Sequence, residues 1–133
     1  MLSFQITESG KEQLFLNRIK NEKRERGVEI PFDLSQEVGR WLFRQTGPDA
    51  YQKEECNPEE TGKLGDYTFE TIKTFEVDSW KSIALKLMYN AKETKYFLNI
   101  QKHTEDRNQH GVEIPIDFVE QIGRYLDAIP KMV

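Results

Sequence analysis

Two stretches of the chain alternate apolar and polar residues with a period of two, the pattern of a β-strand that buries one face. They cover residues 2–7 and 83–89, and each is followed by a short polar turn. A second strand is then expected at about 14–20 in the first case and 95–102 in the second. The pattern therefore predicts two antiparallel hairpins, far apart in the sequence.

The same five residues, Gly-Val-Glu-Ile-Pro, follow both hairpins, at 27–31 and 111–115. Proline cannot donate a hydrogen bond to a strand ladder, so we expect a short strand to stop at each proline. Apolar residues at helical spacing come next. Asp33 and Asp117 each fit a capping box with the residue three positions later, which predicts that the helices begin there.

These matches make the chain an internal repeat. Residues 15–17 (Phe-Leu-Asn) recur 82 positions later as residues 97–99, whereas the Gly-Val-Glu-Ile-Pro segment recurs after 84. We expect the two extra residues in a longer loop between Lys102 and Gly111, because insertions are tolerated in loops. A further strand is expected at 67–77, where Thr, Phe, Ile and Val are frequent. The first copy either lacks this opening strand or has a replacement hidden in the segment between the copies.

A glycine lies inside each expected helix, at Gly39 and Gly123. Glycine there costs about 1 kcal/mol relative to alanine, so we expect close packing against a strand or against the other helix. The fold class predicted by the whole pattern is α+β. Two antiparallel strand meanders, the second of strand-strand-strand-strand-helix type, are each closed by one helix and related by a pseudo-twofold axis.

Residues 45–66 separate the copies and hold six acidic residues, three glycines and two prolines without a sustained apolar period. We interpret them as a mobile, solvated, acidic linker. The first repeat then covers residues 1–44 and the second, more complete repeat covers 67–133. Together they form one domain, for which 133 residues suffice. With 37% hydrophobic residues the chain is not expected to be disordered.

Composition, charge and missing motifs argue against several classes of function. The net charge is −4, and the linker alone carries that excess of acids, with six acidic and two basic residues. No apolar run approaches the roughly 18 residues of a membrane span, and the first residues do not read as a signal peptide, so we expect a cytoplasmic protein with no membrane partner. One cysteine and two histidines favour neither a disulfide framework nor a zinc site. No phosphate-binding glycine motif or nucleophile elbow is present, so we expect neither an enzyme nor a cofactor.

The most distinctive charged feature is a basic segment at the tip of the first hairpin. Five cations fall within nine residues: Arg18, Lys20, Lys23, Arg24 and Arg26. Such a finger neutralises phosphates and gives salt-dependent affinity without base specificity. The alternative is a solvated hairpin tip whose charges protect a sheet edge from aggregation.

A second candidate surface lies on the repeated strands. If Leu16 and Leu98 face the core, their neighbours lie on the opposite face, where aromatic rings stack on bases and amides bond to them. This surface comprises Phe15, Asn17, Phe97, Asn99 and Gln101, extended by Lys86 and Lys102. The alternative is a second buried face, covered by the linker or by a partner subunit.

The layout of residues 96–126, a strand, a charged loop, Gly-Val-Glu-Ile-Pro and an amphipathic helix, is similar to the last two strands and helix of the positive cofactor 4-like transcriptional coactivators. The chain resembles the single-stranded nucleic-acid-binding group that also includes Whirly proteins and Pur-alpha repeats, well over residues 67–129 and partially over 1–44. The resemblance implies binding of unpaired DNA or RNA across curved sheets by Lys, Arg and aromatic residues. It also implies a dimer or a duplicated chain that imitates one.

We therefore expect a non-enzymatic protein that binds single-stranded nucleic acid, DNA rather than RNA, in transcription, replication or recombination. It would act as a homodimer or as a pseudo-dimer within one chain. The rival hypothesis is a small interaction or regulatory protein, of the kind that phages encode, whose sheets pair with another protein and which binds no nucleic acid.

Overall fold

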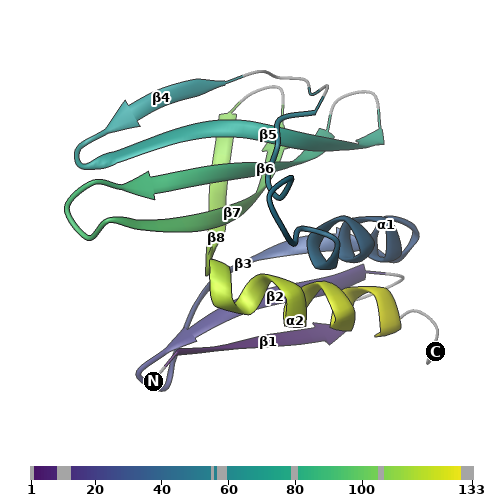
Figure 1. The fold of residues 1–133 in the computed structure, drawn as a ribbon. Helices are drawn as coiled ribbons and strands as arrows, with labels where there is room; N and C mark the ends of the chain where they lie inside the picture. Colours follow the sequence, from purple (N-terminus) through teal and green to yellow (C-terminus); the bar gives the residue numbers. More distant parts are fainter. Residues whose placement is uncertain are drawn as a thin grey trace.

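The structure is a computed structural model that describes residues 2–8, 13–54, 56, 60–78, 81–104 and 107–129. Within these residues, two helices and eight strands follow one another along the chain (Figure 1). They are β1 (Leu2–Glu8), β2 (Gln13–Lys20), β3 (Lys23–Pro31), α1 (Phe32–Phe43), β4 (Thr61–Leu64), β5 (Tyr67–Asp78), β6 (Lys81–Asn90), β7 (Lys95–Thr104), β8 (Arg107–Pro115) and α2 (Ile116–Ala128). The α+β class is confirmed.

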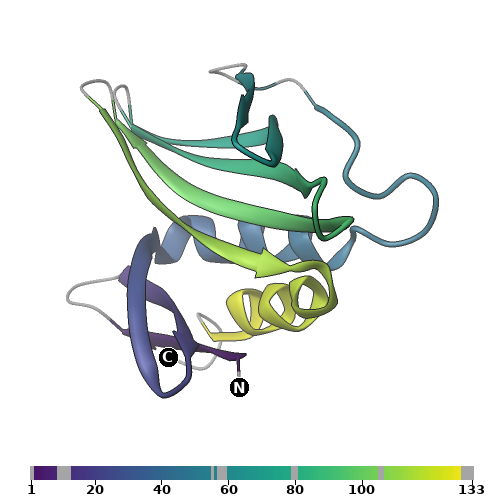
Figure 2. The same cartoon turned by 90° about the vertical axis from the view of Figure 1, so that its left-hand side faces the viewer.

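The strands form two antiparallel sheets, one of three strands in the order β1-β2-β3 and one of five in the order β4-β5-β6-β7-β8. Figure 2 shows that the larger sheet is curved and that both helices lie against one of its faces. The smaller sheet packs on the helices as well, so both sheets and both helices contribute to one hydrophobic core. No helix in the described part of the chain is long and apolar enough to cross a membrane.

Alternation along the strands places the core. Leu14 and Leu16 of β2 are buried, as are Leu98 and Ile100 of β7, which confirms that Leu16 and Leu98 face inward. The intervening residue of β2, Phe15, is only half-buried. Each pair of strands thus presents one apolar face to the helices and a mixed face to the outside.

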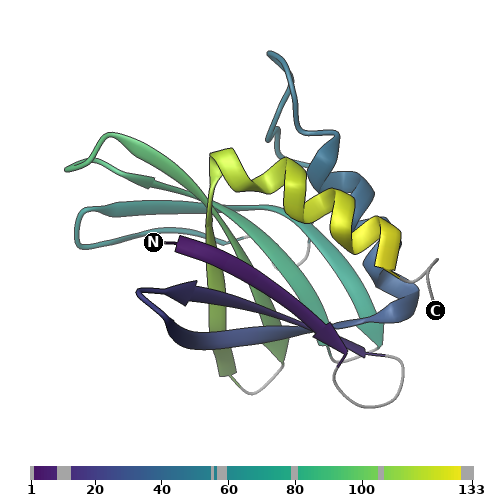
Figure 3. The same ribbon diagram turned by 90° about the horizontal axis from the view of Figure 1, so that it is seen from below.

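The two helices cross at their glycines (Figure 3). A Cβ built on Gly39 would lie 2.5 Å from the carbonyl oxygen of Gly123, and one built on Gly123 would lie 2.7 Å from that of Gly39. Beside the crossing, the buried Ser35 hydroxyl donates to the carbonyl of Leu126 at 2.5 Å. The prediction of close packing at the glycines is confirmed, and the neighbour is the other helix.

The ladders correct the predicted loop length. Leu14 pairs with Ile30 in the first hairpin and Leu98 pairs with Ile114 in the second, so equivalent residues are 84 positions apart on both strands. The register shifts at 17–19 and 101–103 keep the same spacing. The expected longer loop does not exist, because the Phe-Leu-Asn segments sit two residues out of step and Phe97 is equivalent to Gln13.

Part of the segment between the copies is a strand, which the interpretation of residues 45–66 as a solvated linker did not predict. Thr61–Leu64 form β4 on the edge of β5, where Gly62 lies opposite Phe69 and leaves room for its ring. Earlier in the segment, the backbone N–H of Glu54 donates to the carbonyl of Ile72 at 2.8 Å. The sequence did not indicate β4, because the segment is acidic and the strand lies at a polar, exposed edge of the sheet.

The helices begin two residues earlier than the capping-box prediction, which placed their N-caps at Asp33 and Asp117. Pro31 and Pro115 occupy the N-cap positions, and no side chain caps either helix. Asp33 and Asp117 lie in the first turns instead, where a carboxylate interacts favourably with the helix dipole.

Candidate nucleic-acid interface

The basic segment forms a tight hairpin between β2 and β3. Its two turn residues, Asn21 and Glu22, both have positive φ angles of 52° and 66°, as a type I′ turn requires. Lys20, Lys23 and Arg24 are exposed around this turn. They line the end of a regular ladder, because Lys20 pairs with Lys23 in register.

Of the two arginines that follow the turn, Arg24 has a described side chain and Arg26 does not. The Arg24 guanidinium donates to the side-chain oxygen of Gln5 on β1 at 2.7 Å, which holds it beside the smaller sheet while it stays exposed. The side chain of Arg26 lies outside the described residues. Lys20 and Lys23 make no ion pair with any side chain that the structure describes. The described hairpin therefore presents three cations to solvent.

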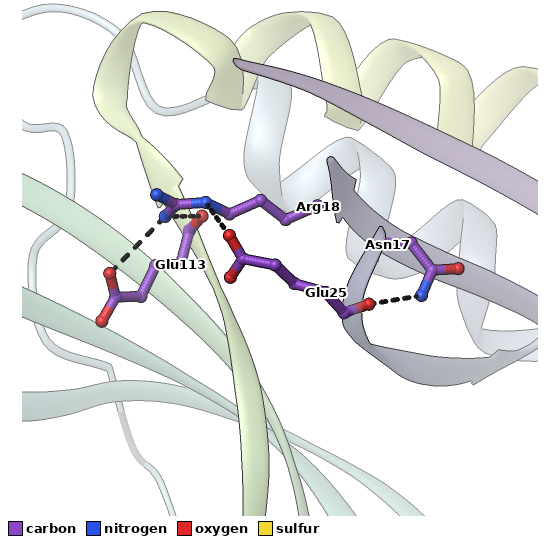
Figure 4. A network of polar contacts seen from close by, with 4 residues as sticks. All are labelled: Asn17, Arg18, Glu25 and Glu113. Atoms are coloured by element: carbon purple, nitrogen blue, oxygen red, sulfur yellow. Dashed lines mark hydrogen bonds and ion pairs between the residues drawn. The ribbon is translucent and has the colours of Figure 1, made fainter. Parts of the chain in front are cut away.

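Arg18 is held inside the protein rather than presented at its surface (Figure 4). Its side chain is 14% exposed and lies 3.5 Å from carboxylate oxygens of both Glu25 and Glu113. It also donates to the backbone carbonyl of Glu113 at 3.2 Å. Asn17 beside it is 2% exposed and donates to the carbonyl of Glu25 at 3.1 Å. Both residues tie the basic hairpin together, and Arg18 also connects it to β8.

Lys102 of the second copy forms an equivalent ion pair with the first copy. Its ammonium lies 3.9 Å from a carboxylate oxygen of Glu29 on β3. Arg18 and Lys102 are 84 residues apart, as are Glu29 and Glu113, so each copy binds a glutamate of the other copy. The sequence contained this signal, because both pairs share the spacing of the repeated pentapeptide.

Lys86 is also neutralised within the chain. It is 8% exposed, its ammonium lies 2.8 Å from a carboxylate oxygen of Glu60, and it sits 5.3 Å from the centre of the Phe69 ring. Glu60 belongs to the predicted linker, so this partner was not foreseen. Lys86 is thus a buried, paired cation on the outer face of the larger sheet.

The two predicted stacking residues lie in unlike surroundings. Phe15 sits against Gly27, where an added Cβ would come within 2.5 Å of the ring. Phe97 lies between Met88 on β6 and Pro115 on β8 in the ladder and is half-buried. Both rings therefore keep part of their surface in solvent.

Asn99 and Gln101 share the outer face of β7 with Phe97 and are half-buried. The Asn99 side chain packs directly on Gly111, which has no side chain to exclude it. Its oxygen is buried and has no hydrogen-bond partner among the described residues. The pentapeptide glycines are therefore required for packing, since a side chain from the neighbouring strand covers each of them.

A polar pocket of about 360 Å³ joins the two copies. Its lining includes Arg18, Lys20 and Glu25 from the first copy and Asn99 and Glu113 from the second. Three of the predicted site residues, Arg18, Lys20 and Asn99, thus meet at one place. Phe15, Phe97 and Lys86 are not part of this lining.

The chain has two histidines, His103 on β7 and His110 on β8. His103 is half-buried, but the side chain of His110 lies outside the described residues, so the pair has no described geometry. No group of three potential metal ligands occurs within the described residues. No protein-family model matches the chain, and a comparison with curated proteins finds no match.

Proposed function

We propose that this protein binds single-stranded nucleic acid, DNA in preference to RNA, through the basic β2–β3 hairpin. The observation that carries the proposal is the trio of exposed cations, Lys20, Lys23 and Arg24, on a hairpin fixed by a two-residue turn. A rigid, positively charged finger contacts phosphates without ordering a flexible loop first, which lowers the entropic cost of binding.

The outer face of β7 supplies the second part of the proposed interface. Phe97 offers a partly exposed ring for stacking. Asn99 lines the polar pocket together with Lys20, and its buried oxygen has no hydrogen-bond partner among the described residues. Stacking on an aromatic ring contributes about 1 to 3 kcal/mol per base and tolerates any sequence. The pocket also holds Glu25 and Glu113, so phosphate is expected at Lys20 and the hairpin tip rather than deep inside it.

Arg18, Lys86 and Lys102 contribute less to this proposal than the exposed cations. Each already faces a carboxylate of the chain, at 3.5, 2.8 and 3.9 Å respectively. A phosphate has to displace that carboxylate before it gains a contact. Asn17, at 2% exposed, is assigned to the support of the hairpin.

The two-repeat arrangement belongs to the same proposal. We infer an approximate twofold axis between the copies, supported by the mutual approach of Gly39 and Gly123 and by the reciprocal pairs Arg18–Glu113 and Lys102–Glu29. This arrangement, with curved antiparallel sheets, is what the resemblance to positive cofactor 4-like coactivators, Whirly proteins and Pur-alpha repeats implies. A transcription, replication or recombination role follows from that resemblance.

The test is a titration of fluorescein-labelled oligothymidine with the full chain, followed by anisotropy at several salt concentrations. Replacing Lys20, Lys23 and Arg24 together by glutamine is expected to weaken binding of all sequences alike. Three lost contacts flatten the slope of log K against log salt by about 2, at roughly 0.7 per phosphate contact on a single strand. Labelled oligouridine in the same assay tests the preference for DNA.

The matched control removes three positive charges away from the β2–β3 hairpin. Lys63, Lys92 and Lys95 are exposed near the β4–β5 and β6–β7 turns of the larger sheet, and their triple glutamine variant is expected to bind almost as well as the wild type. Equal losses in both variants would mean that only net charge matters. No binding of the wild-type chain at micromolar concentration in low salt would refute the proposal and favour the interaction protein.

Phe97→Ala tests the stacking surface separately. A loss of roughly 1 to 3 kcal/mol in binding with an unchanged urea midpoint supports a stacking role. Phe97→Leu keeps the apolar contacts with Met88 and Pro115, and is expected to preserve stability while still losing affinity. If Phe97→Ala lowers stability and leaves affinity unchanged, Phe97 is a packing residue.

A further inference from the structure

The first edge of the smaller sheet is open. Among the residues that the structure describes, β1 pairs with β2 along its whole length and with no other strand. Its counterpart in the second copy is β6, which pairs with β7 on one side and with β5 on the other. Among the described residues, the first copy thus has no strand at the place that β5 fills in the second, which is one of the two alternatives that the sequence left open.

In the second copy, β5 shows what a strand beside β6 contributes to the core. β5 runs antiparallel to β6 and sends Ile72 and Phe75 into the core. In the first copy, an apolar groove of about 360 Å³ lies between β1 and α2. It is lined by Leu2, Phe4 and Ile6 from the strand and by Phe118, Ile122 and Tyr125 from the helix. Figure 3 shows β1 running past α2 along this side of the molecule.

Within the part of the chain that the structure describes, nothing along β1 protects this edge. Sheet edges are usually blunted by lysine, proline or a bulge. β1 has no lysine and no proline, pairs with β2 without a register shift, and carries its first charge at Glu8. Its sequence also suits pairing with itself, because the seven residues Leu2–Glu8 are centred on an uncharged residue, Gln5.

We propose that β1 pairs antiparallel with β1 of a second copy of this chain, with Gln5 opposite Gln5 at the centre. Phe4 then lies opposite Ile6 of the other copy, twice, on the side of the helices. An aromatic residue opposite a β-branched one is a favourable cross-strand pair. Ser3 lies opposite Thr7 on the other face of the sheet, so hydroxyl groups face one another just outside the two apolar pairs. The two smaller sheets become one continuous sheet, and the rims of the two grooves meet.

The first measurement is sedimentation equilibrium of the full chain without nucleic acid. The expected mass is twice that of one chain, and a chain that stays monomeric up to about 100 μM overturns the proposal. Because no nucleic acid is present, this outcome is independent of the proposed binding function.

The register is tested by disulfide trapping in a Cys56→Ser background. Opposed Cα atoms in an antiparallel pair lie about 4.5 to 5.5 Å apart, within the range of a disulfide, so Gln5→Cys is expected to form a covalent dimer under mild oxidation. Ser3→Cys alone places the two thiols about 13 Å apart along the strands and is not expected to do so. Ser3→Cys combined with Thr7→Cys restores trapping.

A matched pair of surface tyrosines tests the groove. Tyr125 lines it and is 54% exposed, whereas Tyr96 on β7 is 55% exposed and lies on the larger sheet. Tyr125→Asp is expected to raise the dimer dissociation constant at least tenfold, and Tyr96→Asp is expected to leave it unchanged. A dimer that traps Ser3→Cys as readily as Gln5→Cys, or that tolerates Tyr125→Asp, uses another surface and overturns the proposal.

Discussion

Replacing Gly39 by alanine is expected to destabilise the protein, although alanine is the better helix former. The added Cβ would lie 2.5 Å from the carbonyl oxygen of Gly123 and 2.6 Å from the backbone nitrogen of Asp127, whereas real Cβ contacts are essentially never below 3.0 Å. Both neighbours are backbone atoms, so no change of rotamer relieves the overlap. The helices have to move apart by at least about half an ångström.

The expected size follows from two opposing effects. Alanine in place of glycine inside a helix gains about 1 kcal/mol. Forcing extra volume into a well-packed contact costs about 1 to 3 kcal/mol, and here the separation also weakens the buried hydrogen bond from Ser35 to Leu126. We therefore place the cost near 3 kcal/mol and the net destabilisation near 2 kcal/mol, which lowers Tm by about 6 to 10 °C in a domain of this size.

Urea denaturation followed by circular dichroism measures this change. Glu37→Ala, at an exposed position of the same helix, is the control and is expected to shift stability by less than about 0.5 kcal/mol. Gly39→Ala combined with Gly123→Ala is expected to cost less than the sum of the single changes, because the first already separates the helices. If Gly39→Ala stabilises the protein by about 1 kcal/mol, helix propensity alone acts and the crossing is not tight.

Three further predictions concern buried polar groups. Ser35→Ala leaves the carbonyl of Leu126 without its donor and is expected to cost about 1 to 2 kcal/mol in a urea titration. Glu60→Gln removes the anion beside the buried Lys86 and is expected to cost about 1 to 3 kcal/mol, whereas Lys86→Met, which removes the buried charge, is expected to be closer to neutral in the same assay. Burial raises the pKa of Tyr51 above 10.0, so the stability that this group contributes is present below pH 10 and is lost above it. The urea midpoint is therefore expected to fall less between pH 9 and pH 11 in Tyr51→Phe than in the wild type.

Local periodicity was enough to predict most of the fold. Alternation placed β1 and β6, and the repeated pentapeptide placed β3 and β8 with a helix after each. The helix glycines predicted a close approach, since an unexplained cost of about 1 kcal/mol needs a compensating contact. These features are local, and burial of one face per element enforces each of them.

The errors arose where a distant residue decides the structure. The Phe-Leu-Asn match suggested a longer loop, but the ladder follows burial of Leu14 and Leu98 instead, which are 84 residues apart. β4 lacks an apolar period because it is an exposed edge, and only the Phe69 ring opposite Gly62 accounts for it. The partners of Arg18 come from β3 and from β8, so no local pattern reveals that this cation is neutralised.

Comparison of the two copies separates supporting residues from candidate binding residues. At a spacing of 84, Val28, Ile30 and the crossing glycine recur unchanged or as similar apolar residues, and these are buried. The cation–glutamate connections recur too, which assigns Arg18 and Lys102 to the junction between the copies. The hairpin tip does not recur, because Lys20 corresponds to Thr104 and Arg24 to Asn108.

Packing of the two copies requires the recurring residues in both copies. It does not constrain which residues occupy a hairpin tip. Lys20, Lys23 and Arg24 surround the first turn, and Thr104, Arg107 and Asn108 surround the second, so two of the three cations have no counterpart. A difference confined to the residues next to the two turns, on hairpins whose ladders have the same register, changes the local charge without changing the fold. Under the proposed function, we therefore expect electrostatic contacts with a nucleic-acid backbone to concentrate at the first tip, and the second tip is its internal control.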